Sequence, residues 1–200
     1  MQSIDGTTRA QFLRRGATGG LALVAGGSLL ATTGGPALAA GSDPSDVDIA
    51  KLAATAELLA VDFYTRCLDS GVFGGRRERY LSGARSNEQD HYDALAQLIG
   101  ADAPKNLKFQ YPAGTFASRE NASNTGIALE TAFIGAYLGA IRALDDPNLK
   151  VVAGQICANE FGHYIVFTDI LTGLPVGPSF PGPELTADAA GAALAPFIAG

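Results

Sequence analysis

Four long stretches of the chain carry apolar residues at every third or fourth position, and segments that contain glycine or proline separate them. They cover about residues 47–70, 76–99, 124–144 and 148–172. This spacing is typical of the buried face of an amphipathic helix. A shorter alanine-rich stretch, roughly 187–195, predicts one more helix with Thr186 as its N-cap. We therefore predict an all-α chain with four long helices and a short C-terminal one.

Two of the three connections between the long helices are short turns, near residues 71–75 and 145–148. Each turn would join its neighbours into an antiparallel hairpin. The connection over residues 100–122 is long, contains prolines and shows no helical period. Such a length needs a reason in a compact domain, and a crossover along a bundle supplies one. The pattern predicts a four-helix bundle with a long crossover between its second and third helices. The aromatic residues expected to pin the crossover to the outside are Phe109, Tyr111 and Phe116.

The hexapeptide pattern N-E-x-x-H-Y occurs twice, at residues 87–92 and 159–164. It includes the only two histidines of the chain, and each follows a glutamate by three residues. On a helix, residues at this spacing share a face, so each pair directs a carboxylate and an imidazole toward one point. A single pair would also suit an ordinary surface helix. Two matching hexapeptides favour a shared site.

The repeat extends upstream of both hexapeptides. Glu57 is followed seven residues later by Tyr64, and Glu130 is followed seven residues later by Tyr137. Each glutamate stands about 30 residues before its hexapeptide, so the two hairpins place their polar residues at nearly the same height. The two tyrosines could hydrogen-bond a carboxylate, and core packing explains them equally well. The predicted inward faces also include Leu98 on the second helix and Val152 on the fourth.

Six charged or titratable residues thus fall on the apolar faces of the predicted bundle. They are Glu57, Glu88, His91, Glu130, Glu160 and His163. A buried carboxylate costs several kcal/mol unless it is paired or bound to a metal. No lysine or arginine lies on the predicted inward faces. Four carboxylates balance the charge of two divalent ions, and iron or manganese suits carboxylates with imidazoles. A mononuclear zinc site would leave ligands unused.

On these motifs, residues 47–172 resemble the ferritin-like superfamily, which includes bacterioferritins and rubrerythrins. The long crossover and the Pro/Gly-rich C-terminal extension, residues 173–200, are similar to the exported branch that includes plant desiccation-related proteins. The resemblance implies that Glu88 and Glu160 bridge two metal ions, iron first and manganese as the alternative. The implied terminal ligands are Glu57 with His91, and Glu130 with His163.

The resemblance also implies that the six residues serve as catalytic residues that react with dioxygen or peroxide. The corresponding activities are ferroxidase, peroxidase or oxygenase, and catalase for manganese. Two alternatives stay open. One is a non-enzymatic desiccation or stress protein with a structural or vestigial metal site, and the other is iron storage in a cage. Assembly into a homo-oligomer is left open as well.

Residues 1–39 have the pattern of an export signal. Arginines precede a glycine-rich, mildly apolar run, and Ala37-Leu38-Ala39 matches a small-residue cleavage site. Residues 8–14 resemble a twin-arginine signal with Ala10 in place of the second arginine. We expect an exported protein, in the periplasm, the cell envelope or the medium, without stable membrane insertion after cleavage. A disordered tail or an uncleaved anchor is the alternative. Residues 40–46 are expected to form a linker.

The net charge of the chain limits the classes of partner that we expect. The formal net charge is −6, so the basic surface that nucleic acids require is missing. An acidic surface favours the approach of cations instead. We therefore expect metal ions as partners and no nucleic acid, and the resemblance adds dioxygen or peroxide.

Overall fold

The computed structural model describes residues 44–199, so the predicted export signal lies outside the described part of the chain. The described residues are helical apart from turns, connections and one isolated β-bridge. The α-helices are α2 (Asp46–Asp69), α3 (Arg76–Ile99), α4 (Arg119–Ala143), α5 (Pro147–Thr172) and α6 (Ala187–Leu194). Two short 3₁₀ turns follow α3 and α6, namely η1 (Gly100–Asp102) and η2 (Ala195–Phe197). The predicted all-α bundle with a short C-terminal helix is confirmed.

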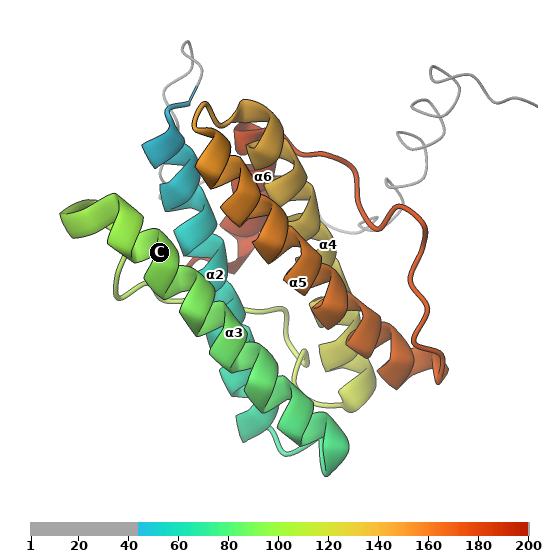
Figure 1. The fold of residues 1–200 in the computed structure, drawn as a ribbon. Coiled ribbons are helices and arrows are strands. Elements are labelled where there is room, and N and C mark those ends of the chain that lie inside the picture. The colour runs from blue at the N-terminus through green and yellow to red at the C-terminus, as the bar shows by residue number, and fades with distance from the viewer. Residues whose placement is uncertain (1–43, 200) are drawn as a thin grey trace, which may run out of the picture.

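The four long helices form two hairpins, α2 with α3 and α4 with α5, which lie beside each other (Figure 1). Their ends follow from local sequence. Ser45 and Asp48 form a capping box at the start of α2, and Asp146 caps α5 just before Pro147. Gly173 ends α5 with a left-handed backbone, φ 73°, which glycine adopts without steric cost. The side chain of Asp46 also accepts the backbone N–H groups of Asp145 and Asp146, at 2.8 and 3.0 Å, so it ties α2 to the α4–α5 turn.

Helix α4 begins at Arg119, five residues earlier than the predicted start at about 124. Ser118 caps it: its hydroxyl oxygen accepts the backbone N–H of Asn121 at 3.1 Å. The first turn is polar and largely exposed. Hydrophobic periodicity therefore misses it, although the serine cap was present in the sequence.

Burial differs from the predicted faces in two places. Leu98 and Val152 are 48% and 36% exposed, because they lie at the bundle end where α3 finishes and α5 starts. Leu59 and Phe63 of α2 are fully buried although they lie beside the predicted inward face. The reason is that α2 is covered on two sides, by the bundle and by the chain that follows α3 and α5.

The long connection between α3 and α4 packs on the outside of α2. Its aromatic residues contact Phe63, with ring centroids 5.9 Å away for Tyr111 and 5.8 Å for Phe116. The backbone of the connection then pairs with the end of the chain. Gln110 N–H donates to the Phe197 carbonyl at 2.8 Å, and a second bond links residues 108 and 199 at 2.9 Å. The expectation that aromatics hold the crossover against the bundle is met.

The Pro/Gly-rich extension runs from the end of α5 back toward α6 (Figure 1), and its last part, residues 182–185, lies directly on α4. Leu185 N–H donates to the Gly135 carbonyl at 2.9 Å. A Cβ atom at Gly139 would lie only 1.7 Å from the Leu185 carbonyl oxygen, so only glycine permits this contact. Helix α6 then contacts α4 and α2 and buries Ala190 and Leu194. The bundle therefore carries its own C-terminal segment as an outer layer.

Helix α4 is also long and apolar enough to meet the length and hydropathy criteria for a membrane span, over Arg119–Ala143. Its best window has a mean hydropathy of 1.2, and 44% of that window is buried inside the structure. Contacts with α5, α2 and α6 account for this apolar character.

Replacing Gly139 with alanine should destabilise the protein, because the new Cβ collides with the Leu185 carbonyl and forces the extension away from α4. Overpacking of this kind costs about 1–3 kcal/mol of unfolding free energy. The matched control is Gly83→Ala, on α3, where a Cβ meets nothing within 4 Å. That change should stabilise the helix by about 0.5–1 kcal/mol. Denaturant unfolding measures both, and equal effects at the two positions would contradict the described packing.

Candidate metal centre

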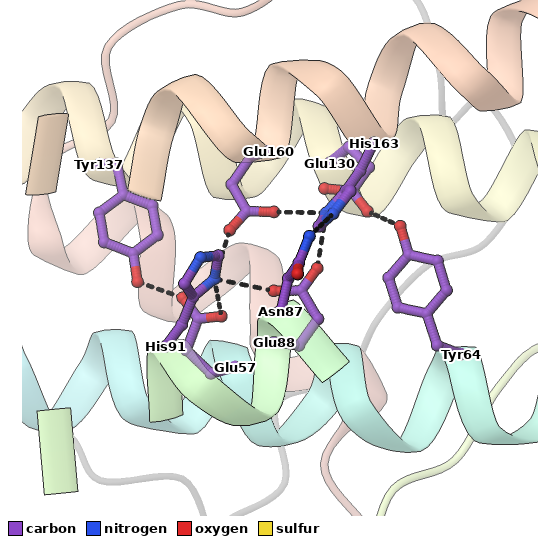
Figure 2. A network of polar contacts seen from close by, with 9 residues as sticks. All are labelled: Glu57, Tyr64, Asn87, Glu88, His91, Glu130, Tyr137, Glu160 and His163. Atoms are coloured by element: carbon purple, nitrogen blue, oxygen red, sulfur yellow. Dashed lines mark hydrogen bonds and ion pairs between the residues drawn. The ribbon is translucent and has the colours of Figure 1, made fainter. Parts of the chain in front are cut away.

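The four long helices bring all six predicted residues together in the middle of the bundle (Figure 2). Helices α2 and α4 contribute one glutamate each, and α3 and α5 contribute a glutamate and a histidine each. All four glutamates are 2% exposed or less, and His163 is 1% exposed. The side chain of His91 is 15% exposed, which makes it the most accessible member. A site closed on the other sides thus opens slightly at His91.

The six side chains form two overlapping groups of potential ligands. One consists of Glu57, Glu88, His91 and Glu160, and the other of Glu88, Glu130, Glu160 and His163. Within each group the ligand atoms lie within 4.8 Å of one another. Glu88 and Glu160 belong to both groups. The arrangement therefore offers two neighbouring positions for a cation, with two carboxylates between them.

Each histidine turns its Nδ1 toward the carboxylates. His163 Nδ1 lies 2.7 Å from Glu88 Oε1 and 3.2 Å from Glu160 Oε2. His91 Nδ1 lies 3.2 to 3.3 Å from one oxygen each of three glutamates. Several donor atoms therefore converge on a small volume, as they do around a bound ion.

Three carboxylate oxygens lack a hydrogen-bond partner although donor atoms lie close to them. Glu88 Oε1, Glu130 Oε2 and Glu160 Oε1 are buried and have no hydrogen-bond partner. For Glu88 Oε1 the nearby Nδ1 of His163 is close but not aligned as a hydrogen-bond donor. Buried acceptors without a donor are costly. The residues present therefore fit a pair of cations that would occupy the space between these oxygens.

The charges of the buried residues also indicate a site that fits cations. Within residues 44–199, no lysine or arginine forms an ion pair with any of the four glutamates. Burial raises the pKa of the carboxyl groups of Glu57 and Glu88, and it raises that of Glu130 well above its ordinary value. Without a metal, protons are the cations that keep this cluster neutral enough to remain buried.

The histidines hold part of that positive charge. Burial alone would lower the pKa of His91, but the three carboxylates around its Nδ1 raise it to about 12. Burial also opposes the charged form of His163, and the nearby carboxylates of Glu160 and Glu88 raise its pKa to about 11. Both shifts favour the charged imidazolium, in which each Nδ1 carries a proton in the metal-free protein. A metal ion would have to displace these protons in order to bind Nδ1.

Two tyrosines support the cluster from opposite ends, and they do so across the hairpins. Tyr64 of α2 donates to Glu130 Oε1 of α4 at 2.5 Å, and Tyr137 of α4 donates to Glu57 Oε1 of α2 (Figure 2). Burial and the neighbouring carboxylates raise the pKa of both hydroxyls well above the ordinary value, so both remain neutral donors. Of the two interpretations that the sequence left open, the hydrogen bond to a carboxylate is the one observed. Each tyrosine binds the glutamate of the other hairpin.

Sequence reasoning missed the asparagine that begins each hexapeptide. The side-chain nitrogen of Asn87 lies 3.4 Å from His163 Nε2, the ring atom that faces away from the carboxylates (Figure 2). A contact of this kind orients an imidazole, and when Nδ1 carries a proton or a metal the amide oxygen of Asn87 must be the atom that accepts from Nε2–H. The signal for it was available, because asparagine precedes the glutamate in both repeats. Asn159 has a buried side-chain oxygen without a hydrogen-bond partner.

Comparison with known families gives a match over residues 45–173 to the ferritin-like domain. The chain belongs to the ferritin-like domain family. The matched range covers α2 to α5 and all six residues of the cluster, and it leaves the C-terminal extension outside. None of the curated proteins compared with this ferritin-like chain matches it. Family membership and the two Glu/His groups together support a site that could hold metal ions.

Metal binding to this ferritin-like chain should weaken as the solution is acidified. The raised pKa values mean that protons occupy the metal-free cluster, and a lower pH favours that protonated form. Calorimetric titration with Mn²⁺ in buffers of different ionisation enthalpy measures both affinity and released protons. We expect proton release and at least a tenfold loss of affinity between about pH 8 and pH 6. An affinity that stays constant over this range would argue against ligation by these groups.

Removing one tyrosine hydroxyl should weaken one half of the site. Tyr137→Phe frees the carboxylate of Glu57, and the loss of such a supporting contact typically costs about 10- to 100-fold in metal affinity. Tyr64→Phe should do the same through Glu130. The control is Tyr164→Phe, because that hydroxyl makes no hydrogen bond to the cluster in the described structure. We expect the Mn²⁺ titrations to show one weakened and one unchanged site in each test variant. An unchanged affinity in both would show that the tyrosines serve packing alone.

Proposed function

We propose that this ferritin-like protein binds two divalent metal ions, with iron as the first candidate, and that it reacts with dioxygen or peroxide. The observation that carries the proposal is the pair of overlapping Glu/His groups, which are buried and have no lysine or arginine partner in the described part of the chain. Glu88 and Glu160 would bridge the two ions because both groups contain them. Glu57 with His91 would complete one position, and Glu130 with His163 would complete the other. When bound, a pair of ferrous ions supplies two electrons to the oxidant together.

The chain's own residues would prepare the site for this reaction. Burial excludes water from the four carboxylates, and a dry environment strengthens their attraction for cations. Tyr64 and Tyr137 keep two carboxylates in place and retain their own protons. Asn87 would hold the ring of His163 so that Nδ1 faces the cluster. The partly exposed edge of His91 offers the side from which small oxidants and ions would arrive.

A protective role outside the cytoplasm follows as part of the same proposal. The residues that support it are 1–39, with their arginines and the small-residue sequence at 37–39. Removal of ferrous iron and oxidant together would limit oxidative damage under stress. N-terminal sequencing of the native protein tests the export component, since cleavage after Ala39 leaves a chain that begins at Ala40.

The central experiment compares the oxidation of added ferrous ion in the presence and absence of metal-free protein. We expect the wild-type protein to accelerate oxidation by dioxygen or peroxide over the buffer control. Glu88→Ala and Glu160→Ala should abolish the acceleration, because each removes a carboxylate shared by both groups. Glu78→Ala is the matched control, since this exposed residue lies in the first turn of α3, far from the cluster. Optical spectroscopy follows the ferric product.

The same assay separates this function from the alternative. A non-enzymatic stress protein with a structural metal would bind two ions and still oxidise ferrous ion no faster than buffer does. That result, together with two irons demonstrably bound, would reject the enzyme and retain the structural protein. A cage for iron storage would be recognised by its mass in solution, because a cage requires many subunits.

A further inference from the structure

An apolar cavity of about 360 Å³ lies at one end of the bundle, between all four long helices. It occupies the end where α2 and α5 begin and where α3 and α4 finish. Among the described residues, no lysine, arginine, aspartate or glutamate contributes to its wall, and Gln97 is the one amide side chain there. Leu98 and Val152, both partly exposed, belong to the same wall, so the apolar surface continues outward to solvent.

The inner end of this cavity adjoins the carboxylate cluster. Ala53 and Ile156 line it, and they stand four residues before Glu57 and Glu160. Four helical residues rise about 6 Å, so the wall begins one turn away from the ligand atoms. Tyr137 gives the direct link, because it lines the cavity and its hydroxyl donates to Glu57.

The opposite end of the cluster is filled, and the internal repeat shows which residues make the difference. His163 is followed four residues later by Phe167, whereas His91 is followed four residues later by Leu95. Phe167 is fully buried and stacks on the ring of Tyr64, with centroids 5.8 Å apart. The smaller Leu95 lines the cavity instead.

A second pair of equivalent positions shows the same change. Leu81 stands seven residues before Glu88 and is fully buried at the filled end. Its equivalent, seven residues before Glu160, is Ala153, which lines the cavity. At both pairs of equivalent positions the larger residue lies at the filled end and the smaller one lines the cavity. The hollow therefore depends on which side chains the folded bundle brings to each end, and it does not follow from the repeated architecture.

We propose that this cavity binds a small apolar organic molecule, hydrocarbon in character, beside the metal centre. That this molecule is a substrate of the centre rests on the proposed function, whereas its binding does not. An engineered apolar cavity of about 150 Å³ holds benzene, so this one has room for a molecule of roughly twice that size. The uncharged wall gives an ion or a charged head group no partner, which makes the cavity unsuitable as a route for iron.

Naphthalene is a suitable probe because it is apolar, has about the required size and fluoresces. The full chain is titrated with it, both metal-free and with Mn²⁺ bound. Ala153→Leu installs the residue that the other repeat carries at this position and should fill part of the cavity. We expect its affinity for naphthalene to be at least tenfold weaker than that of the wild type. Ala158→Leu, an exposed position on the same helix, is the matched control and should bind like the wild type.

A second variant keeps the test decisive if Ala153→Leu folds poorly. Leu95→Phe installs the equivalent of Phe167 and should reduce naphthalene binding in the same way. The proposal is overturned if the wild type does not bind naphthalene, or if both variants bind it as tightly as the wild type does. A dimer that excludes naphthalene and dissociates on Leu98→Asp also overturns it, because a second copy would then cover the cavity. Binding is measured without iron, so a negative result in the ferrous oxidation assay leaves this inference standing.

Discussion

Four carboxylates lie buried in the middle of a helical bundle, and no lysine or arginine of residues 44–199 neutralises them. The rest of this structure depends on that constraint. Such a cluster costs several kcal/mol unless cations or protons compensate it. Each long helix must therefore present its glutamate at one height and supply an apolar face around it to keep water away. The nearly equal separations within the two hairpins, 31 residues from Glu57 to Glu88 and 30 from Glu130 to Glu160, meet this requirement.

The cluster also joins the two hairpins. The tyrosine hydroxyls cross from α2 to α4 and from α4 to α2, so each hairpin fixes a carboxylate of the other. The crossed bonds and the position of each histidine beside both shared glutamates relate the two halves by an approximate two-fold arrangement (Figure 2). The same few side chains therefore pack the hairpins together and form the groups that could hold metal ions.

The outer layers break this approximate symmetry. The long connection, the extension and α6 cover α2 and α4, while α3 keeps few buried residues and a largely polar surface. The partial exposure of His91 lies on the uncovered side. The two ends of the cluster differ as well, because aromatic residues fill one and the cavity occupies the other. Access to the site and preference for a bound organic molecule would therefore depend on the asymmetric parts, whereas the six candidate metal ligands belong to the repeat.

The sequence by itself determined the helices, the hairpins and the six residues that meet. These features depend on spacing within a helix and on the length of turns, which are local and repeat in the chain. It did not reveal the start of α4, since that first turn is polar, nor the burial of Phe63, which requires the distant residues Tyr111 and Phe116. Tertiary structure alone decided that each tyrosine binds the glutamate of the other hairpin and that one bundle end stays hollow. Both outcomes depend on how helices far apart in the chain are placed, and no periodicity within one helix records that placement.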